Sequence, residues 1–176
     1  MSICLLDTSV FVGFLNVPNM NTQHAEICDE LKQKIRDGEF LFLPLATILE
    51  TGNHIAQNRN GTQRRKIAVF FVEQVQLALE GKSPFTPIVT PKQEAMQQWL
   101  TEFPDFAMRG QGLGDLSIIH DWKRMCALSP AHRVYICSHV RHLASHDRKP
   151  SSCPTPGTAL RSQPARNRLK TPEPTG

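Results

Sequence analysis

The sequence has no apolar run near the roughly 18 residues that a membrane helix needs. It also lacks the basic start, the long apolar core and the small-residue cleavage site of a signal peptide. We therefore expect neither a membrane protein nor a secreted one. The five cysteines are an odd number and form no C-x-x-C pair, which argues against a disulfide framework or a cysteine zinc site. Such cysteine usage suits the reducing cytoplasm, where we expect the protein to act.

Two common catalytic signatures are also missing. The chain contains no glycine-rich phosphate-binding loop of the P-loop kind, and it shows no Ser-His-Asp order. Chemistry driven by a nucleoside triphosphate, or based on an activated serine, therefore lacks its residues.

The positive charge of the chain gathers at its C-terminal end. The formal net charge is +4, but residues 148–176 hold six of the 20 basic side chains and one acidic side chain. Six of the 13 prolines lie in the same segment. We interpret residues 1–147 as one folded domain and residues 148–176 as a basic, proline-rich, disordered tail. Nonspecific contact with RNA phosphates, or no role at all, is consistent with such a tail.

Short apolar runs alternate with segments of helical periodicity along the folded domain. We expect buried strands at Ile3–Leu6, Phe40–Leu43, Pro87–Val89 and Val134–Cys137, with helices between them. Strands and helices in alternation are typical of βαβ units. The sequence therefore predicts an α/β fold, a three-layer α/β/α sandwich with a short, mainly four-stranded parallel sheet.

Local signals predict several element ends. Gly38 is expected just after the second helix, and Asn60 before a long fourth helix. Thr90 is expected as the N-cap of the next helix, with Gln93 at the capping-box position. Residues 103–112 contain a proline and two glycines and are expected to form a loop.

Three acidic side chains are expected at the edge of the sheet where its strands end. Asp7 follows the first strand, Glu50 lies on the helix after the second, and Asp115 begins a later helix. Singly, each has an ordinary explanation as a helix cap, a solvated side chain or an acid favoured by the helix dipole. Together they predict a site for Mg²⁺ or Mn²⁺, which bind carboxylate oxygens and keep several waters.

The segments around these acids resemble the motifs of a known family. Leu5–Val10, Leu43–Glu50 and Gly112–Ile119 are similar, in order and approximate spacing, to the successive motifs of PIN-domain ribonucleases. This family includes the VapC-type toxins of bacterial toxin–antitoxin pairs, and the resemblance covers about residues 2–147. It implies a four-stranded parallel sheet and an acidic Mg²⁺ or Mn²⁺ site that cleaves RNA. It also raises an antitoxin protein and a second copy of the chain as partners.

The resemblance assigns roles residue by residue. Thr8 and Ser9 would supply hydroxyls that steady the first acid or a metal-bound water. At the fourth motif the family usually has Ser or Thr followed by Asp or Asn, whereas Ser138 or His139 occupies that place here and no acid is present. The catalytic residues and metal ligands carried over are the three acids: Asp7, Glu50 and Asp115.

Other polar clusters carry two interpretations each. His139, His142 and His146 would share one helical face, either as a zinc or nickel site or, as we prefer, as a solvated stripe. His54 lies four residues after Glu50 and either orients it or is an ordinary surface histidine. Residues 64–66 (Arg-Arg-Lys) would contact RNA phosphates or form a solvated face.

The sequence thus predicts a metal-dependent endoribonuclease. A phosphatase of the haloacid-dehalogenase kind also begins with an aspartate after a strand, but it would need a second aspartate where Ser9 stands. The alternative from a different class is a catalytically weak interaction or RNA-binding module with the same fold, which the missing fourth acid allows. Manganese-dependent RNA cleavage that is lost on Asp7→Asn would separate the two.

Overall fold

The computed structural model describes residues 1–89 and 91–150. Its strands form one sheet in the order β3-β2-β1-β4-β5, in which the first four are parallel and β5 runs antiparallel to β4. The predicted α/β class is confirmed, and a strand lies at or close to each of the four expected places, although the third begins two residues before the expected Pro87–Val89 and does not include Val89. The strands are β1 (Ser2–Leu6), β2 (Phe40–Pro44), β3 (Phe85–Ile88), β4 (Arg133–Cys137) and β5 (Asp147–Arg148).

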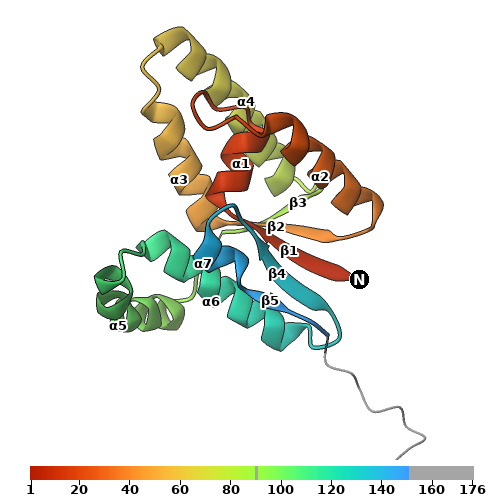
Figure 1. The fold of residues 1–176 in the computed structure, drawn as a ribbon, viewed down its shortest axis with the longest axis vertical. Coiled ribbons are helices and arrows are strands. Elements are labelled where there is room, and N and C mark those ends of the chain that lie inside the picture. Colours follow the sequence, from red (N-terminus) through yellow and green to blue (C-terminus); the bar gives the residue numbers. More distant parts are fainter. Residues whose placement is uncertain (90, 151–176) are drawn as a thin grey trace, which may run out of the picture.

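Helices lie on both faces of this sheet. Figure 1 shows α1 to α4 on one side, with α6 and α7 on the other and α5 packed outside against α6. The arrangement is a three-layer α/β/α sandwich. The helices of the described residues are α1 (Thr8–Phe14), α2 (His24–Arg36), α3 (Leu45–Ala56), α4 (Gly61–Leu79), α5 (Gln93–Met108), α6 (Leu113–Leu128) and α7 (Arg141–Ala144).

Each face of the sheet has its own hydrophobic core. Side chains alternate along β1, so Cys4 and Leu6 pack under α1 to α4, whereas Ile3 and Leu5 pack under α6 and α7. A parallel sheet that is covered on both faces needs apolar residues at every position, which is why β1 has no polar alternation. None of the helices among the described residues is long and apolar enough to cross a membrane.

The fifth strand was not expected. Arg133 binds Asp147 through two hydrogen bonds, Nε to Oδ1 at 2.9 Å and Nη2 to Oδ2 at 2.7 Å. Arg148 donates from Nη2 to the carbonyl oxygens of Ser129 and His132, at 2.7 and 2.9 Å. A strand of two residues carries no periodicity, so the sequence pattern could not show it. The folded domain was expected to end at residue 147, but β5 includes Arg148 and so extends the sheet by one residue. The part of the expected tail from residue 151 onward lies outside the described residues.

Two of the local signals have the predicted effect. Gly38 follows α2 with φ of 69°, a left-handed conformation that glycine adopts without steric cost. Asn60 is the N-cap of α4, and its side chain accepts a 3.0 Å hydrogen bond from the backbone N–H of Gln63.

The expected start of α5 is wrong, and so is the first part of the expected loop at 103–112, whereas residues 109–112 do lie outside the helices. The helix begins at Gln93 with Lys92 as its N-cap, while the predicted cap, Thr90, lies outside the described residues. Residues 103–108 are helical although Pro104 lies inside the helix. Phe106 packs against the core under α6, and this tertiary contact outweighs the helix-breaking tendency of the proline. The chain turns only at Gly110, with φ of 73°.

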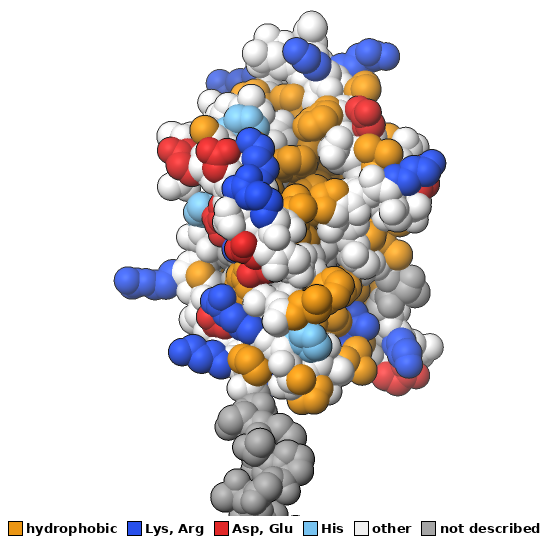
Figure 2. Space-filling view, turned by 90° about the vertical axis from the view of Figure 1, so that its right-hand side faces the viewer, with side chains coloured by type: hydrophobic (Ala, Val, Ile, Leu, Met, Phe, Trp, Pro, Cys, Tyr) orange, Lys and Arg blue, Asp and Glu red, His pale blue; other side chains and the backbone are white. Residues whose placement is uncertain are grey.

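The molecular surface combines charged and apolar side chains. On the face shown in Figure 2, hydrophobic side chains form a band that runs between charged groups, with Lys and Arg at its margins. Helix α4 is one source of exposed hydrophobic side chains, among them Val69, Val72 and Leu79. Its hydrophobic residues therefore do not all face the core, in contrast to those of β1.

Candidate active site

The three acids predicted from the sequence lie at the carboxyl edge of the sheet. Asp7 directly follows β1, Glu50 lies in α3 after β2, and Asp115 lies in the first turn of α6. Burial is the largest cause that raises the pKa of Glu50, and the Asp115 and Asp7 carboxylates raise it further. The fold therefore brings the carboxylates of Asp7 and Asp115, from separate parts of the chain, within electrostatic reach of Glu50.

Asp7 is held rigidly. The residue is 3% exposed, and its Oδ2 accepts hydrogen bonds from the Ser9 backbone N–H at 3.2 Å, the Ser9 hydroxyl at 2.7 Å and the Ser138 hydroxyl at 2.8 Å. The backbone N–H of Asp7 donates to the carbonyl of Cys137 at 3.0 Å. One carboxylate oxygen thus joins the start of α1 to the chain after β4. Of the hydroxyls expected near the first acid, those of Ser9 and Ser138 contact Asp7, whereas that of Thr8 contacts Glu50 instead.

Glu50 is positioned from two sides. The Thr8 hydroxyl donates a 2.8 Å hydrogen bond to Oε2, which opposes the rise in the Glu50 pKa. His54, one turn further along α3, also lowers that pKa. Gly114 lies directly against the Glu50 carboxylate, so that a methyl group at this position would overlap Oε1. The glycine before Asp115 is therefore required by a close approach between α6 and α3.

Asp115 has a partner that the sequence interpretation missed. Nε2 of His142 in α7 lies 3.0 Å from Oδ2 of Asp115. The signal was present, since His142 is the middle member of the predicted histidine stripe, but its distance of 27 residues from Asp115 hid the contact. The fold brings α7 beside the first turn of α6, which no local pattern indicates.

The histidine stripe does not form a metal site of its own. His139 is exposed, and its backbone N–H donates to the Ser9 hydroxyl at 3.0 Å. The ring of His146 packs edge-on against Trp122 with centroids 5.0 Å apart. The three side chains therefore lie in three different neighbourhoods. The expected solvated stripe on one helical face is wrong, because α7 covers only Arg141–Ala144 and both His142 and His146 are half-buried.

The three carboxylates do not form a ready-made metal site. Within residues 1–89 and 91–150, no group of three or more His, Cys, Asp and Glu side chains is arranged so that it could hold a metal ion. Each acid has one oxygen in a hydrogen bond with the protein. The second oxygen of each acid has no hydrogen bond among the described residues; these atoms are Asp7 Oδ1, Glu50 Oε1 and Asp115 Oδ1. Carboxylate oxygens are the ligands that Mg²⁺ and Mn²⁺ prefer, whereas zinc sites are built mainly from Cys and His, so the donor types fit Mg²⁺ or Mn²⁺ better than zinc.

The basic cluster at residues 64–66 has a partly structural role. Arg64 directs Nη1 to the carbonyl oxygens of Ala56 and Asn58, at 3.4 and 3.3 Å, and so closes the turn between α3 and α4. Arg65 and Lys66 are exposed and line a shallow hollow on α4. These two side chains remain free to contact an anionic ligand.

Comparison of this chain with protein-family models, with curated proteins and with solved structures found no match. We therefore infer its function from the residues and the geometry of the chain alone. Fold and site together define an α/β protein with a carboxylate cluster at the carboxyl edge of a mainly parallel sheet.

Proposed function

We propose that this protein is a metal-dependent endoribonuclease whose Mg²⁺ or Mn²⁺ is bound by Asp7, Glu50 and Asp115. The observation that carries the proposal is the gathering of these carboxylates at one sheet edge, where two of them raise the pKa of the third. Neighbouring like charges destabilise a protein unless a cation neutralises them. The resemblance of the same three segments to the motifs of PIN-domain ribonucleases supports the RNA substrate.

The roles of the side chains follow from their hydrogen bonds. A divalent cation in this cluster would supply a Lewis acid and an acidified water for in-line displacement at a phosphate. Ser9 and Ser138 hold one oxygen of Asp7 and would leave the other for the cation. Thr8 holds one oxygen of Glu50 in the same way, and His142 is the corresponding positioning residue for Asp115.

The finer form of the proposal is a toxin of a toxin–antitoxin pair that acts in the cytoplasm, alone or as a homodimer. A neighbouring gene for a small DNA-binding antitoxin would support this form. Its absence would leave the nuclease proposal itself unchanged, because the carboxylate cluster belongs to this chain alone.

The proposal is tested by cleavage of a labelled single-stranded RNA. We expect cleavage by the full chain with Mn²⁺, none with EDTA, and none for Asp7→Asn or Asp115→Asn. The matched control is Asp105→Asn, the same chemical change at an exposed position of α5, which should cleave as the parent does. Cleavage that persists in Asp7→Asn at the parental rate would overturn the assignment.

One observation favours the alternative, an RNA-binding or interaction module without cleavage. Ser138, rather than an acid, donates to Asp7 at the place of the fourth motif, so the cluster carries one negative charge fewer than the family pattern. RNA that binds equally well with EDTA and with Mn²⁺, and stays intact in both, would establish this alternative.

A further inference from the structure

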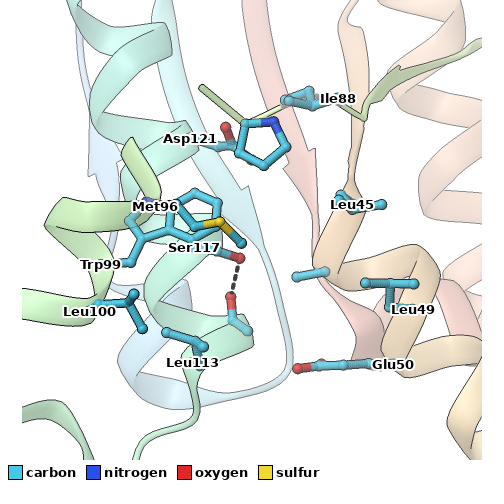
Figure 3. Close-up of a pocket in the computed structure, with 13 residues that line it drawn as sticks. Leu45, Leu49, Glu50, Ile88, Met96, Trp99, Leu100, Leu113, Ser117 and Asp121 are labelled. Atoms are coloured by element: carbon cyan, nitrogen blue, oxygen red, sulfur yellow. Dashed lines mark hydrogen bonds between the residues drawn. The ribbon is translucent and has the colours of Figure 1, made fainter. Parts of the chain in front are cut away.

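A half-open apolar pocket lies beside Glu50. It has a volume of about 320 Å³ and lies between α3 on one side and α5 and α6 on the other. Figure 3 shows Glu50 at one end of this pocket and Asp121 at the other, with Trp99 and Met96 across from Leu45. Because Glu50 belongs to both, the pocket is continuous with the proposed metal site.

Asp121 is the unusual member of the pocket wall. Its side chain is 15% exposed, and burial raises its pKa. Oδ1 accepts a 3.1 Å hydrogen bond from Arg124, whose side chain is half-exposed. A carboxylate oxygen has two lone pairs, so Asp121 retains acceptor capacity toward the pocket. The proposed metal site does not use Asp121.

We propose that this pocket binds one unstacked guanine base of a single-stranded RNA. The inference rests on the proposed function, because it places the base beside the acids that would face the scissile phosphate. Proteins recognise single-stranded RNA mainly by splaying out bases, stacking them on aromatic side chains and reading their Watson–Crick edges. The pocket supplies an aromatic ring in Trp99, apolar walls for the base faces, and one polar group at its far end.

The chemistry of that polar group selects the base. An ionised carboxylate only accepts hydrogen bonds, so it requires a base edge that carries donors. Guanine presents two adjacent donors, N1–H and the N2 amino group, which match the two oxygens of Asp121. Adenine and cytosine each present a single amino group. Uracil presents one N–H between two carbonyl oxygens, which the carboxylate repels. The expected order of affinity is guanine first and uracil last.

The proposal is tested by calorimetric titration of the full chain in EDTA, where no metal-dependent cleavage takes place. The probes are four pentanucleotides that are uridine except at the central position, which carries G, A, C or U. We expect the guanine probe to bind about tenfold more tightly than the uridine probe. Asp121→Asn should reduce this preference to within about twofold, because an amide presents a donor as well as an acceptor. The control Asp105→Asn should keep it.

A second variant separates stacking from recognition of the base edge. Trp99→Leu should weaken the binding of all four probes by a similar factor and keep their order, because stacking tolerates every base. Equal affinity for the four probes, no binding of any of them, or an unchanged preference in Asp121→Asn would each overturn the proposal. A dimer in solution that dissociates on Leu100→Arg would also overturn it, since a second copy would then fill the pocket.

The outcomes also distinguish this proposal from the proposed nuclease function. A guanine preference in EDTA without any Mn²⁺-dependent cleavage would retain the base pocket and reject the nuclease. Cleavage with Mn²⁺ and no base preference in either assay would retain the nuclease and reject the pocket.

Discussion

The hydroxyl of Thr8 donates a 2.8 Å hydrogen bond to Oε2 of Glu50, across 42 residues of sequence. Thr8 is 6% exposed and directly follows Asp7, the N-cap of α1. Two adjacent residues therefore belong to the site: Asp7 is one of its acids, and Thr8 holds a second acid, Glu50. The bond lowers the pKa of Glu50, whereas burial and the carboxylates of Asp115 and Asp7 raise it, with a net rise. The pKa of Glu50 thus depends on groups from separate parts of the chain: Thr8 in α1, Asp7 before it, and Asp115 in α6.

The raised pKa of Glu50 predicts the pH dependence of stability without metal. The folded pKa exceeds the ordinary value of 4.5, so above that pH the folded state binds more protons than the unfolded state. The free energy of unfolding therefore falls as pH rises through this interval. Glu50→Gln removes the effect, and in EDTA its Tm should exceed the parental Tm by about 1–3 °C at pH 7. The difference should vanish well below the ordinary pKa.

Glu102 provides the control of opposite sign. Burial by itself would raise its pKa, but the hydrogen bond and charge of His120, together with Lys123 and Gln98, lower the pKa overall. Glu102→Gln should therefore be less stable than the parent at pH 7, and this difference in stability should shrink at acidic pH. Melting curves from pH 4 to pH 8 would measure both variants. A Glu50→Gln variant less stable than the parent at pH 7 would contradict the assigned like-charge cluster.

Asp7 allows its cap role to be separated from its proposed metal role. Asparagine is as good an N-cap as aspartate, so Asp7→Asn should keep the Tm within a few degrees while it abolishes cleavage. Asp7→Ala removes the acceptor of the Ser9 and Ser138 hydroxyls and should cost about 1–2 kcal/mol of stability. Thermal melting with EDTA, together with the cleavage assay, would check both. A large loss of Tm in Asp7→Asn would identify the carboxylate charge as structural.

Gly114 and Gly52 form a matched pair around Glu50. Gly114→Ala should push the Glu50 carboxylate away from α6 and lower Mn²⁺ affinity and cleavage by roughly tenfold, about 1.4 kcal/mol. Gly52 lies in α3, and a methyl group there would meet no atom within 4 Å. Gly52→Ala should raise stability by up to about 1 kcal/mol through helix propensity and leave cleavage unchanged. Calorimetric titration with Mn²⁺ would compare them, and equal effects would exclude the close contact as the cause.

Arg148 is expected to stabilise the edge of the sheet. Its guanidinium donates to the carbonyl oxygens of Ser129, Pro130 and His132, which join β5 to the turn before β4. Arg148→Ala should cost about 1–3 kcal/mol, since hydrogen bonds from a charged donor are the stronger ones. The neighbouring exposed residue supplies the control, and Lys149→Ala should leave the Tm within about 1 °C. Chemical denaturation of both variants would measure the difference.

Much of the sheet could be predicted because its strands are apolar on both faces. Ile3–Leu6 and Val134–Cys137 are continuous hydrophobic runs bounded by polar residues, and the structure contains both as strands. The interior of α5 could not be predicted in this way. Pro104 and the glycines after it indicate a loop, and only the packing of Phe106 against the core under α6 explains why the helix continues.

The sequence by itself determined which side chains stand at the ends of strands, and therefore that Asp7 and Glu50 share one edge of a parallel sheet. Strand direction is enough for this, because every parallel strand ends at the same edge. The resemblance already places Ser138 near the acids, but only the tertiary structure decided the other two contacts, Gly114 against Glu50 and His142 with Asp115. These contacts join segments far apart in sequence, and they depend on how α6 and α7 pack against the sheet, which local propensity and periodicity do not encode.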